Sequence, residues 1–97
     1  MQIGTRTNEV TELIINDNCE FDDFYSFAGQ LKNKLKIRYY NKLDDYDSLW
    51  YDFDFEGRKL TLHYNIYFGI SIYPQKGNKA STEEIHVLYS IKSTLES

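Results

Sequence analysis

Cysteine and proline are scarce in this chain of 97 residues, with one of each. Because Cys19 has no second cysteine to pair with, no disulfide can form within the chain, and a metal site built from several thiolates is excluded. Such cysteine usage is typical of a reducing compartment. We therefore expect a cytoplasmic protein.

Long apolar runs are also missing. No segment reaches the roughly 18 consecutive apolar residues that a membrane helix needs. The N-terminal stretch MQIGTRTNEVTELIIN lacks the apolar run of about seven or more residues that marks a signal peptide. We expect a soluble protein that does not associate with membranes.

Positive charge is in the minority, with 11 Lys and Arg residues against 15 Asp and Glu residues and a formal net charge of -4. Binding to nucleic acid needs a basic surface that neutralises phosphates. The densest basic segment runs from Lys32 to Lys42 and spreads over a predicted helix end and the strand after it. It is typical of a solvated face with favourable charge at a helix C-terminus, and binding of an anionic partner is the weaker interpretation. We expect no nucleic-acid partner.

Aromatic residues are abundant by contrast, with nine Tyr and six Phe. A chain of this length forms one domain with one core, and here large rings fill it. We predict a single domain over residues 1–97, with the polar residues 1–8 frayed.

The first half of the chain changes period once. Residues 9–16 alternate between two faces, which predicts a strand. Residues 19–36 instead carry an apolar stripe at steps of three and four, which predicts a helix of about four turns. The stripe consists of Phe21, Phe24, Ala28, Leu31 and Leu35.

Four further strands are predicted after this helix, over residues 37–40, 49–55, 58–64 and 67–74. Residues 41–48 read as a connecting loop. Glu56-Gly57 is suited to a two-residue hairpin turn, because glycine adopts a positive φ without strain. The last three strands therefore form a meander, which the segment at 37–40 can extend.

A second helix is predicted at the C-terminal end of the chain. Ser81 and Glu84 have the spacing of a capping box, and the helix continues to about Leu95. The order strand, helix, strand, meander, helix is typical of an α+β fold, here with two layers: an antiparallel sheet with both helices on one face. The other face, partly open to water, would carry Trp50, Asp52, Asp54, Lys59, Thr61, His63, Ser71 and Tyr73.

The segment LDDYDSLWYDFDFEG, residues 43–57, has six carboxylates and no lysine or arginine. Its end, DFDFEG, matches the first positions of a calcium-binding EF-hand loop. However, His63 stands at the twelfth position, where such a loop needs a bidentate glutamate, and the flanking residues alternate as strands do. We expect no metal site and no cofactor.

Catalysis by a pair of carboxylates would have to use Asp52 with Asp54, or either of them with His63. Alternating aspartates are also what an exposed strand face looks like. The chain has no glycine-rich phosphate loop, no HExxH and no GxSxG. We therefore predict that the protein is not an enzyme, and that His63 is a cross-strand neighbour of Asp52 or Asp54.

A third interpretation is that the acidic and aromatic residues bind another protein and take part in no reaction. Clustered carboxylates repel one another, and a basic partner relieves that repulsion, while nearby rings supply rigid contacts. The predicted partner-binding residues are Asp44, Asp45, Tyr46, Asp47, Trp50, Asp52 and Asp54. Two alternatives stay open: the acidic segment is only a solubilising surface, or the chain is an adaptor or structural domain that self-associates as a homo-oligomer through a sheet edge or the open face.

In size, charge, tyrosine content and element order, the whole chain resembles the immunity proteins that bacteria make beside polymorphic toxins, including those of contact-dependent growth inhibition. These families share no common motif, so no site residue is carried over from them. The resemblance implies a tight complex with a cognate toxin domain, often a basic nuclease, whose active site is blocked by acidic and aromatic groups.

Overall fold

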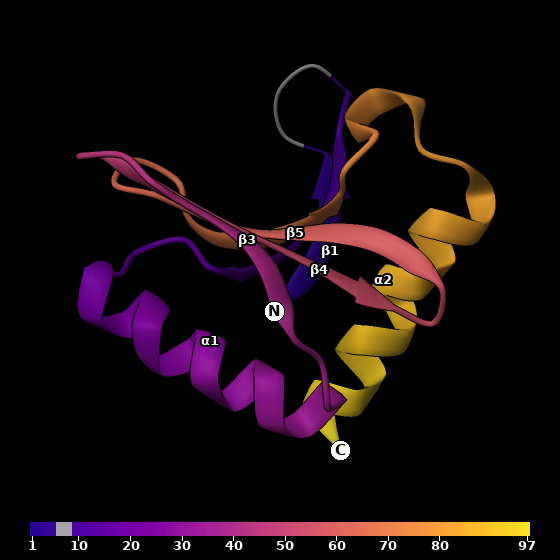
Figure 1. The fold of residues 1–97 in the computed structure, drawn as a ribbon. Coiled ribbons are helices and arrows are strands. Elements are labelled where there is room, and N and C mark those ends of the chain that lie inside the picture. Colours follow the sequence, from indigo (N-terminus) through magenta and orange to yellow (C-terminus); the bar gives the residue numbers. More distant parts are fainter. Residues whose placement is uncertain (6–8) are drawn as a thin grey trace.

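The computed structural model describes residues 1–5 and 9–97 and has the predicted α+β fold: a six-stranded antiparallel sheet with two helices packed on one side (Figure 1). The strands are β1 (Gln2–Thr5), β2 (Thr11–Asn16), β3 (Tyr39–Asp44), β4 (Ser48–Phe55), β5 (Arg58–Asn65) and β6 (Gly69–Pro74). The helices are α1 (Phe21–Leu35) and α2 (Thr82–Glu96), with a short 3-10 turn at Gly77–Lys79 before α2.

The strands lie in the order β1-β2-β6-β5-β4-β3. The predicted meander is confirmed as β4, β5 and β6, and β3 extends it. Strand β2 pairs with β6 on one side and with β1 on the other, so it is an inner strand. The two edges of the sheet are therefore β1 and β3.

Local hydrogen bonds and backbone conformation account for both ends of α1 and for the start of α2. The amide of Glu20 donates to the Asp23 carboxylate at 2.8 Å, which satisfies a donor at the start of α1. This helix stops at Lys36, which adopts the left-handed conformation with φ 55°. At the start of α2, the predicted capping box is confirmed: the Ser81 amide donates to Glu84 at 3.1 Å, and the Glu84 amide donates to the Ser81 hydroxyl at 3.2 Å.

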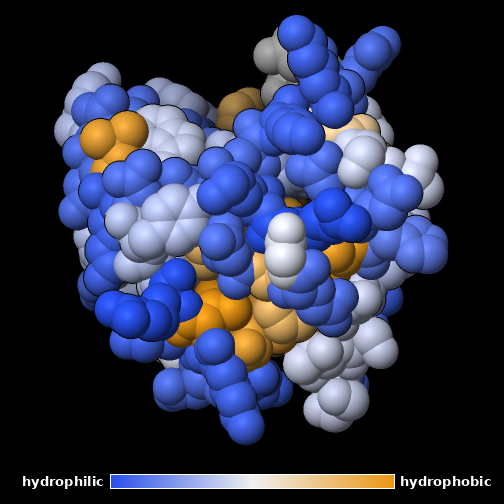
Figure 2. Space-filling model, turned by 45° about the vertical axis from the view of Figure 1, so that its right-hand side comes forward, coloured by the Kyte–Doolittle hydropathy of each residue, from blue (hydrophilic) through white to orange (hydrophobic). Residues whose placement is uncertain are grey.

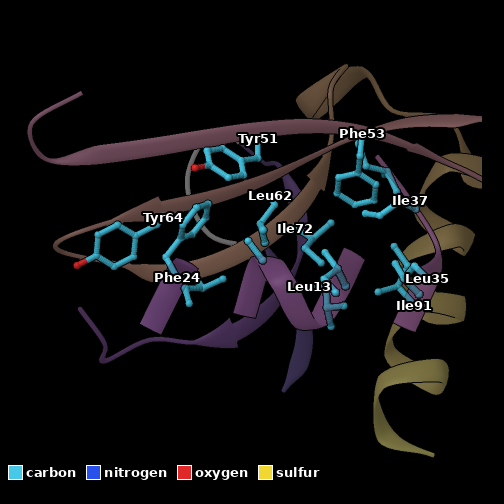
Figure 3. Close-up of a cluster of buried hydrophobic side chains, with 14 of the residues drawn as sticks. Leu13, Phe24, Leu35, Ile37, Tyr51, Phe53, Leu62, Tyr64, Ile72 and Ile91 are labelled. Atoms are coloured by element: carbon cyan, nitrogen blue, oxygen red, sulfur yellow. The ribbon is translucent and has the colours of Figure 1, made fainter. Parts of the chain in front are cut away.

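The core lies between the sheet and the two helices (Figure 3). Alternate residues of the strands point toward the helices, so that Phe53, Leu62 and Ile72 are fully buried. Phe24 of α1 packs edge-on against the ring of Tyr51, with 4.9 Å between ring centroids. Large aromatic side chains thus fill the space between the layers, as the composition predicted.

The chain turns between β4 and β5 at Glu56 and Gly57, which both have positive φ, 53° and 76°. Two consecutive positive φ values match the twist of the flanking strands, and this confirms the predicted hairpin. The turn between β5 and β6 ends at Gly69, whose φ is 78° and whose backbone passes very close to Asn16.

The prediction was wrong at both edges of the sheet. Gln2–Thr5 form strand β1 and pair with β2, whereas we expected residues 1–8 to be frayed; residues 6–8 lie outside the part of the chain that the structure describes. In addition, β3 begins at Tyr39 and continues to Asp44, where we expected a loop from residue 41. Hydrogen bonding to a neighbouring strand decides both cases, since neither segment has an alternating apolar pattern.

Seen from the side in Figure 2, the surface is mostly hydrophilic, with an apolar area near the centre of the lower half. Among the described residues, no helix combines the length and the hydropathy that a membrane crossing requires.

Candidate functional site

Two turns meet at one end of the sheet and form the most exposed aromatic surface of the described chain. They are the β3–β4 turn at residues 45–47 and the β5–β6 turn at residues 66–68, which lie side by side at the left of Figure 1. The amide of Ile66 donates to the carbonyl of Asp47 at 3.1 Å and joins them. We call these six residues the turn surface.

Large side chains on the turn surface are unusually exposed to solvent. The exposed fraction is 87% for Tyr46 and 74% for Tyr67, and Ile66 and Phe68 are about half exposed. Burying such side chains against a partner removes apolar surface from water, which stabilises a complex. Exposed apolar groups gathered in one place are typical of an interaction site.

Side-chain hydrogen bonds hold the backbone of both turns. The Asn65 side chain accepts from the Tyr67 amide at 2.8 Å and donates to the Ser48 hydroxyl at 2.8 Å. In the other turn, the Asp45 carboxylate accepts from the Tyr46 amide at 2.8 Å, and the Asp45 amide donates to the Ser48 carbonyl at 2.8 Å. The backbone that carries the two tyrosines is therefore already fixed before binding, which lowers the entropy lost on binding.

Carboxylates flank Tyr46 in the β3–β4 turn. Asp44 and Asp45 are exposed, and Asp47 is partly exposed. The ion pairs found among residues 1–5 and 9–97 join Lys59 to Asp54, Lys76 to Glu84 and Lys92 to Glu96, so none of them involves an aspartate of the turn surface or Asp44. The negative charge at this end of the sheet is thus available to a cationic partner.

Next to the turn surface, the sheet face away from the helices is hollowed. A cavity of about 350 Å³ lies over β2, β4, β5 and β6, and Phe68 of the turn surface is part of its lining. The rings of Trp50 and His63 stack in its wall with 5.2 Å between centroids, and Tyr73 meets His63 edge-on at 5.7 Å. The carboxylate of Glu12, almost fully buried, belongs to the same lining.

The pKa of Tyr73 reflects the buried and negatively charged surroundings of this hollow. Burial, followed by the nearby Glu12 carboxylate, raises the pKa of Tyr73 to about 12, against a smaller lowering effect of the Trp50 side chain. The phenol is neutral at ordinary pH. It can therefore donate a hydrogen bond to a group that enters the hollow.

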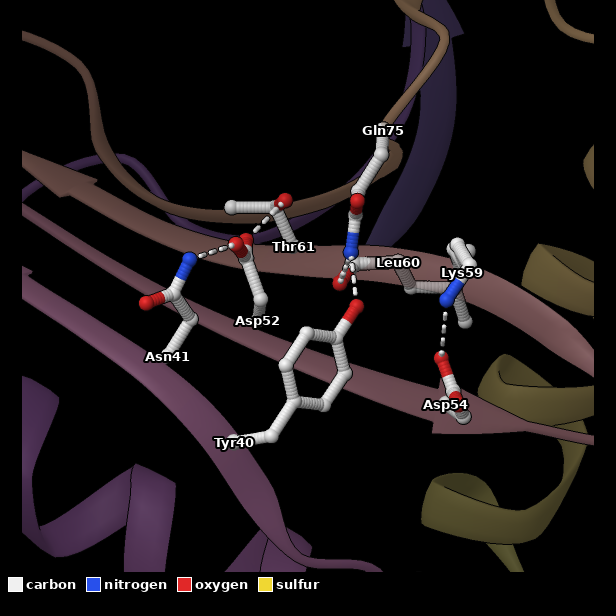
Figure 4. A network of polar contacts seen from close by, with 8 residues as sticks. All are labelled: Tyr40, Asn41, Asp52, Asp54, Lys59, Leu60, Thr61 and Gln75. Carbon is white, nitrogen blue, oxygen red and sulfur yellow. Dashed lines mark hydrogen bonds and ion pairs between the residues drawn. The ribbon is translucent and has the colours of Figure 1, made fainter.

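Farther along the sheet, the carboxylates are engaged by neighbours within the chain (Figure 4). Asp52 accepts from the Thr61 hydroxyl at 2.6 Å and from the Asn41 amide group at 3.3 Å. Asp54 lies 3.8 Å from the ammonium of Lys59. Asp52 thereby joins β3, β4 and β5, whereas the ion pair of Asp54 with Lys59 lies in solvent, where it adds little stability.

The structure thus separates the seven predicted site residues. Asp44, Asp45, Tyr46 and Asp47 lie at or beside the turn surface, and Trp50 lines the hollow. Asp52 and Asp54 lie progressively farther from the turns along β4, with their carboxylates already bonded. The predicted site therefore divides into residues at or beside the turn surface and residues along β4, of which Asp52 is hydrogen-bonded and Asp54 is exposed.

The structure places His63 differently from the prediction. The cross-strand neighbour of His63 is Trp50, not Asp52 or Asp54 as we predicted, because β4 and β5 pair in the register that places Thr61 opposite Asp52. Within the described ranges, no three His, Cys, Asp or Glu side chains are grouped so that they could hold a metal ion.

Sequence reasoning missed the β5–β6 turn as part of the site. It placed Phe68 inside a strand, whereas Ile66, Tyr67 and Phe68 form a turn and project outward. The sequence did contain a signal for this turn. Three apolar residues, 66–68, follow Asn65, and asparagine favours turns. Apolar residues at a predicted turn have little of the core to pack against, which indicates an interaction surface.

Comparison with protein-family models gives one match, over residues 1–91, to the family described as "Protein of unknown function (DUF3630)". The search of curated proteins and the search of solved structures found no match.

Proposed function

We propose that this chain, which belongs to the DUF3630 family, acts by binding another protein through the turn surface and the adjoining hollow. One observation carries the proposal: Tyr46 and Tyr67 extend into solvent from two hydrogen-bonded turns, at 87% and 74% exposure. Tyrosine combines a large contact area with few rotatable bonds and is enriched among residues that dominate binding energy.

Charge indicates the kind of partner. Asp44, Asp45 and Asp47 place three negative charges in and beside the turn that carries Tyr46, and the whole chain carries a formal charge of -4. Complementary charge steers a basic protein toward this end of the sheet and speeds association at low salt. We therefore propose a basic partner.

In its narrowest form, the proposal is that the chain is an immunity protein that blocks a cognate basic toxin domain. The resemblance in size, charge and aromatic content supports this form, as does the exposed acidic and aromatic surface. An inhibitor of this kind acts by occupying the active site of the toxin. It therefore needs tight binding and no catalytic groups of its own.

The gene directly upstream provides the test of this narrow form. The C-terminal domain that it encodes should stop growth when produced alone in host cells, and growth should return when the present chain is produced with it. A domain that is harmless, or one that still kills cells containing this chain, contradicts the immunity function.

Salt dependence tests the electrostatic part of the proposal. Association with the upstream-encoded domain should become slower as ionic strength rises, because salt screens exposed charges. In the variant Asp45→Asn/Asp47→Asn, the association rate should fall and its salt dependence should weaken, while Glu83→Gln on α2 serves as a control. Unchanged rates in the aspartate variant would show that these carboxylates do not steer the partner.

A further inference from the structure

We infer that β3, at the open edge of the sheet, pairs with β3 of a second copy of this chain in one defined antiparallel register. The order of strands ends at β3, and every residue of this strand except Tyr39 is exposed. An exposed edge presents unpaired backbone groups that can form a ladder with another strand. This inference goes beyond the proposed binding of a basic protein and rests on the sheet edge; the two proposals share Asp44, the last residue of β3.

The ladder between β3 and β4 determines which backbone groups point outward. The Asp45 amide donates to Ser48, and in an antiparallel pair such bonded positions alternate. Asn41 and Leu43 therefore turn their backbone groups toward Asp52 and Trp50 of β4. Lys42 and Asp44 turn theirs toward the open edge.

Only three registers bring these outward groups of two antiparallel copies together in bonded pairs. One places Lys42 opposite Lys42, and another places Asp44 opposite Asp44. Like charges directly opposite each other are destabilising in a sheet. The third register places Lys42 opposite Asp44 twice, so that charge selects a single register.

Side-chain orientation agrees with this register. The Lys42 ammonium lies over the Tyr51 ring at 5.1 Å from its centroid, on the face that carries the helices. Asp44 faces the same side, since its carboxylate follows burial among the causes that raise the pKa of Tyr51. Residues opposite each other in a ladder point to the same face, so each lysine can reach the aspartate of the other copy.

The centre of this register is Leu43, which is 63% exposed. It would lie opposite Leu43 of the second copy, on the face away from the helices. Such a non-bonded position brings the two side chains close together. Both leucines would thereby lose solvent contact, which stabilises the dimer.

The number of β3 residues that can pair with the second copy limits the strength of association. A bulge between Tyr39 and Asn41 interrupts the regular pairing, which leaves Asn41–Asp44 for the second copy. Four residues a side bury less than the roughly 1,000 Å² expected of a strong specific interface. The dimer should therefore form only at high protein concentration. The other edge, β1, has no charged residue between Gln2 and Thr5 to select a register.

Charge-reversed variants test the register by sedimentation equilibrium over a range of concentrations. Lys42→Glu and Asp44→Lys should each be monomeric, because each places like charges opposite each other. Mixing the two variants should restore a dimer, and so should the double variant Lys42→Glu/Asp44→Lys. Lys79→Glu, on the turn before α2, should behave as the unaltered chain, and circular dichroism should show that all variants are folded.

Cross-linking gives a second readout that does not depend on affinity alone. In a Cys19→Ser background, Leu43→Cys should form an intermolecular disulfide under mild oxidation, because cysteines at a central non-bonded pair lie close enough. Tyr89→Cys, an exposed position on α2, is the matched control and should cross-link slowly. A chain that is monomeric at every concentration, or variants that dimerise alone as readily as when mixed, would overturn the inference.

Discussion

Two glycines show how much a single residue depends on its surroundings. Gly69 has φ 78°, and a Cβ there would lie 1.9 Å from the Asn16 carbonyl oxygen. Gly29 lies in α1, and a Cβ there would have nothing within 4 Å. The same change to alanine should therefore have opposite effects at the two positions.

We predict that Gly69→Ala lowers the free energy of unfolding by more than about 2 kcal/mol, because strain and a backbone clash act together. Gly29→Ala should raise it by up to about 1 kcal/mol, since glycine is unfavourable inside a helix. Urea denaturation of the two variants measures both values. Equal effects of the two changes would contradict the close approach of β6 to the end of β2.

At the same scale, the sequence predicted four of the residues at or beside the turn surface, Asp44–Asp47, from charge and aromatic content. It could not show that Asp52 is bonded to Thr61, because that contact depends on the register of β4 and β5. Nor could it show that Tyr67 lies next to the β3–β4 turn. The contact joins segments that only the fold brings together.

Among the elements, α2 is the one whose start depends most clearly on a charge. The Ser81 amide bonds to the Glu84 carboxylate, and this bond is the largest cause of the lowered pKa of Glu84, against the opposing effect of burial. A carboxyl with a lowered pKa in the folded state stabilises the fold above its ordinary pKa near 4.5. That stabilisation is lost as the pH falls through the folded-state pKa.

Glu84→Gln should therefore lower the free energy of unfolding by about 1 kcal/mol at neutral pH, and the difference from the unaltered chain should shrink at pH values well below 4.5. Urea denaturation at several pH values measures this. Glu83→Gln, in the same helical turn but exposed, is the control. A difference that stays constant with pH would contradict the role of the Glu84 charge.

Element boundaries could be predicted where burial sets a pattern. Residues 49–55 alternate because one face of β4 is covered by the helices, and the capping box marks the start of α2. Strands β1 and β3 lie at the edges and bury less, so their polar sequences carry no comparable pattern. Their extent follows from backbone pairing, to which amino-acid type contributes little.

Over the whole molecule, buried tyrosine phenols make the stability of the fold depend on pH in the alkaline range. Burial is the largest cause of the raised pKa of Tyr39, Tyr51, Tyr64 and Tyr73. In the unfolded chain these phenols ionise near pH 10, while in the folded chain they remain protonated at higher pH. Stability is therefore complete below pH 10 and falls as the pH rises toward the folded-state values.

We predict that the free energy of unfolding decreases steadily between pH 10 and about 12, where Tyr73 itself titrates. Tyr73→Phe should make this decrease less steep, because one of the four phenols is removed. Denaturant unfolding at fixed pH steps, with tyrosinate absorbance as the second signal, measures the effect. A variant with the same pH dependence as the unaltered chain would contradict the burial of this phenol.

The molecule as a whole packs its helices on one face of the sheet and exposes the turn surface to solvent, beside the hollow on the other face. The affinity of the upstream-encoded C-terminal domain for Tyr46→Ala/Tyr67→Ala, compared with Tyr89→Ala on α2, tests the proposed binding most directly. The double variant should bind at least about 30-fold more weakly than the unaltered chain, and Tyr89→Ala should bind as the unaltered chain does. Equal affinity of all three proteins would contradict binding through the turn surface.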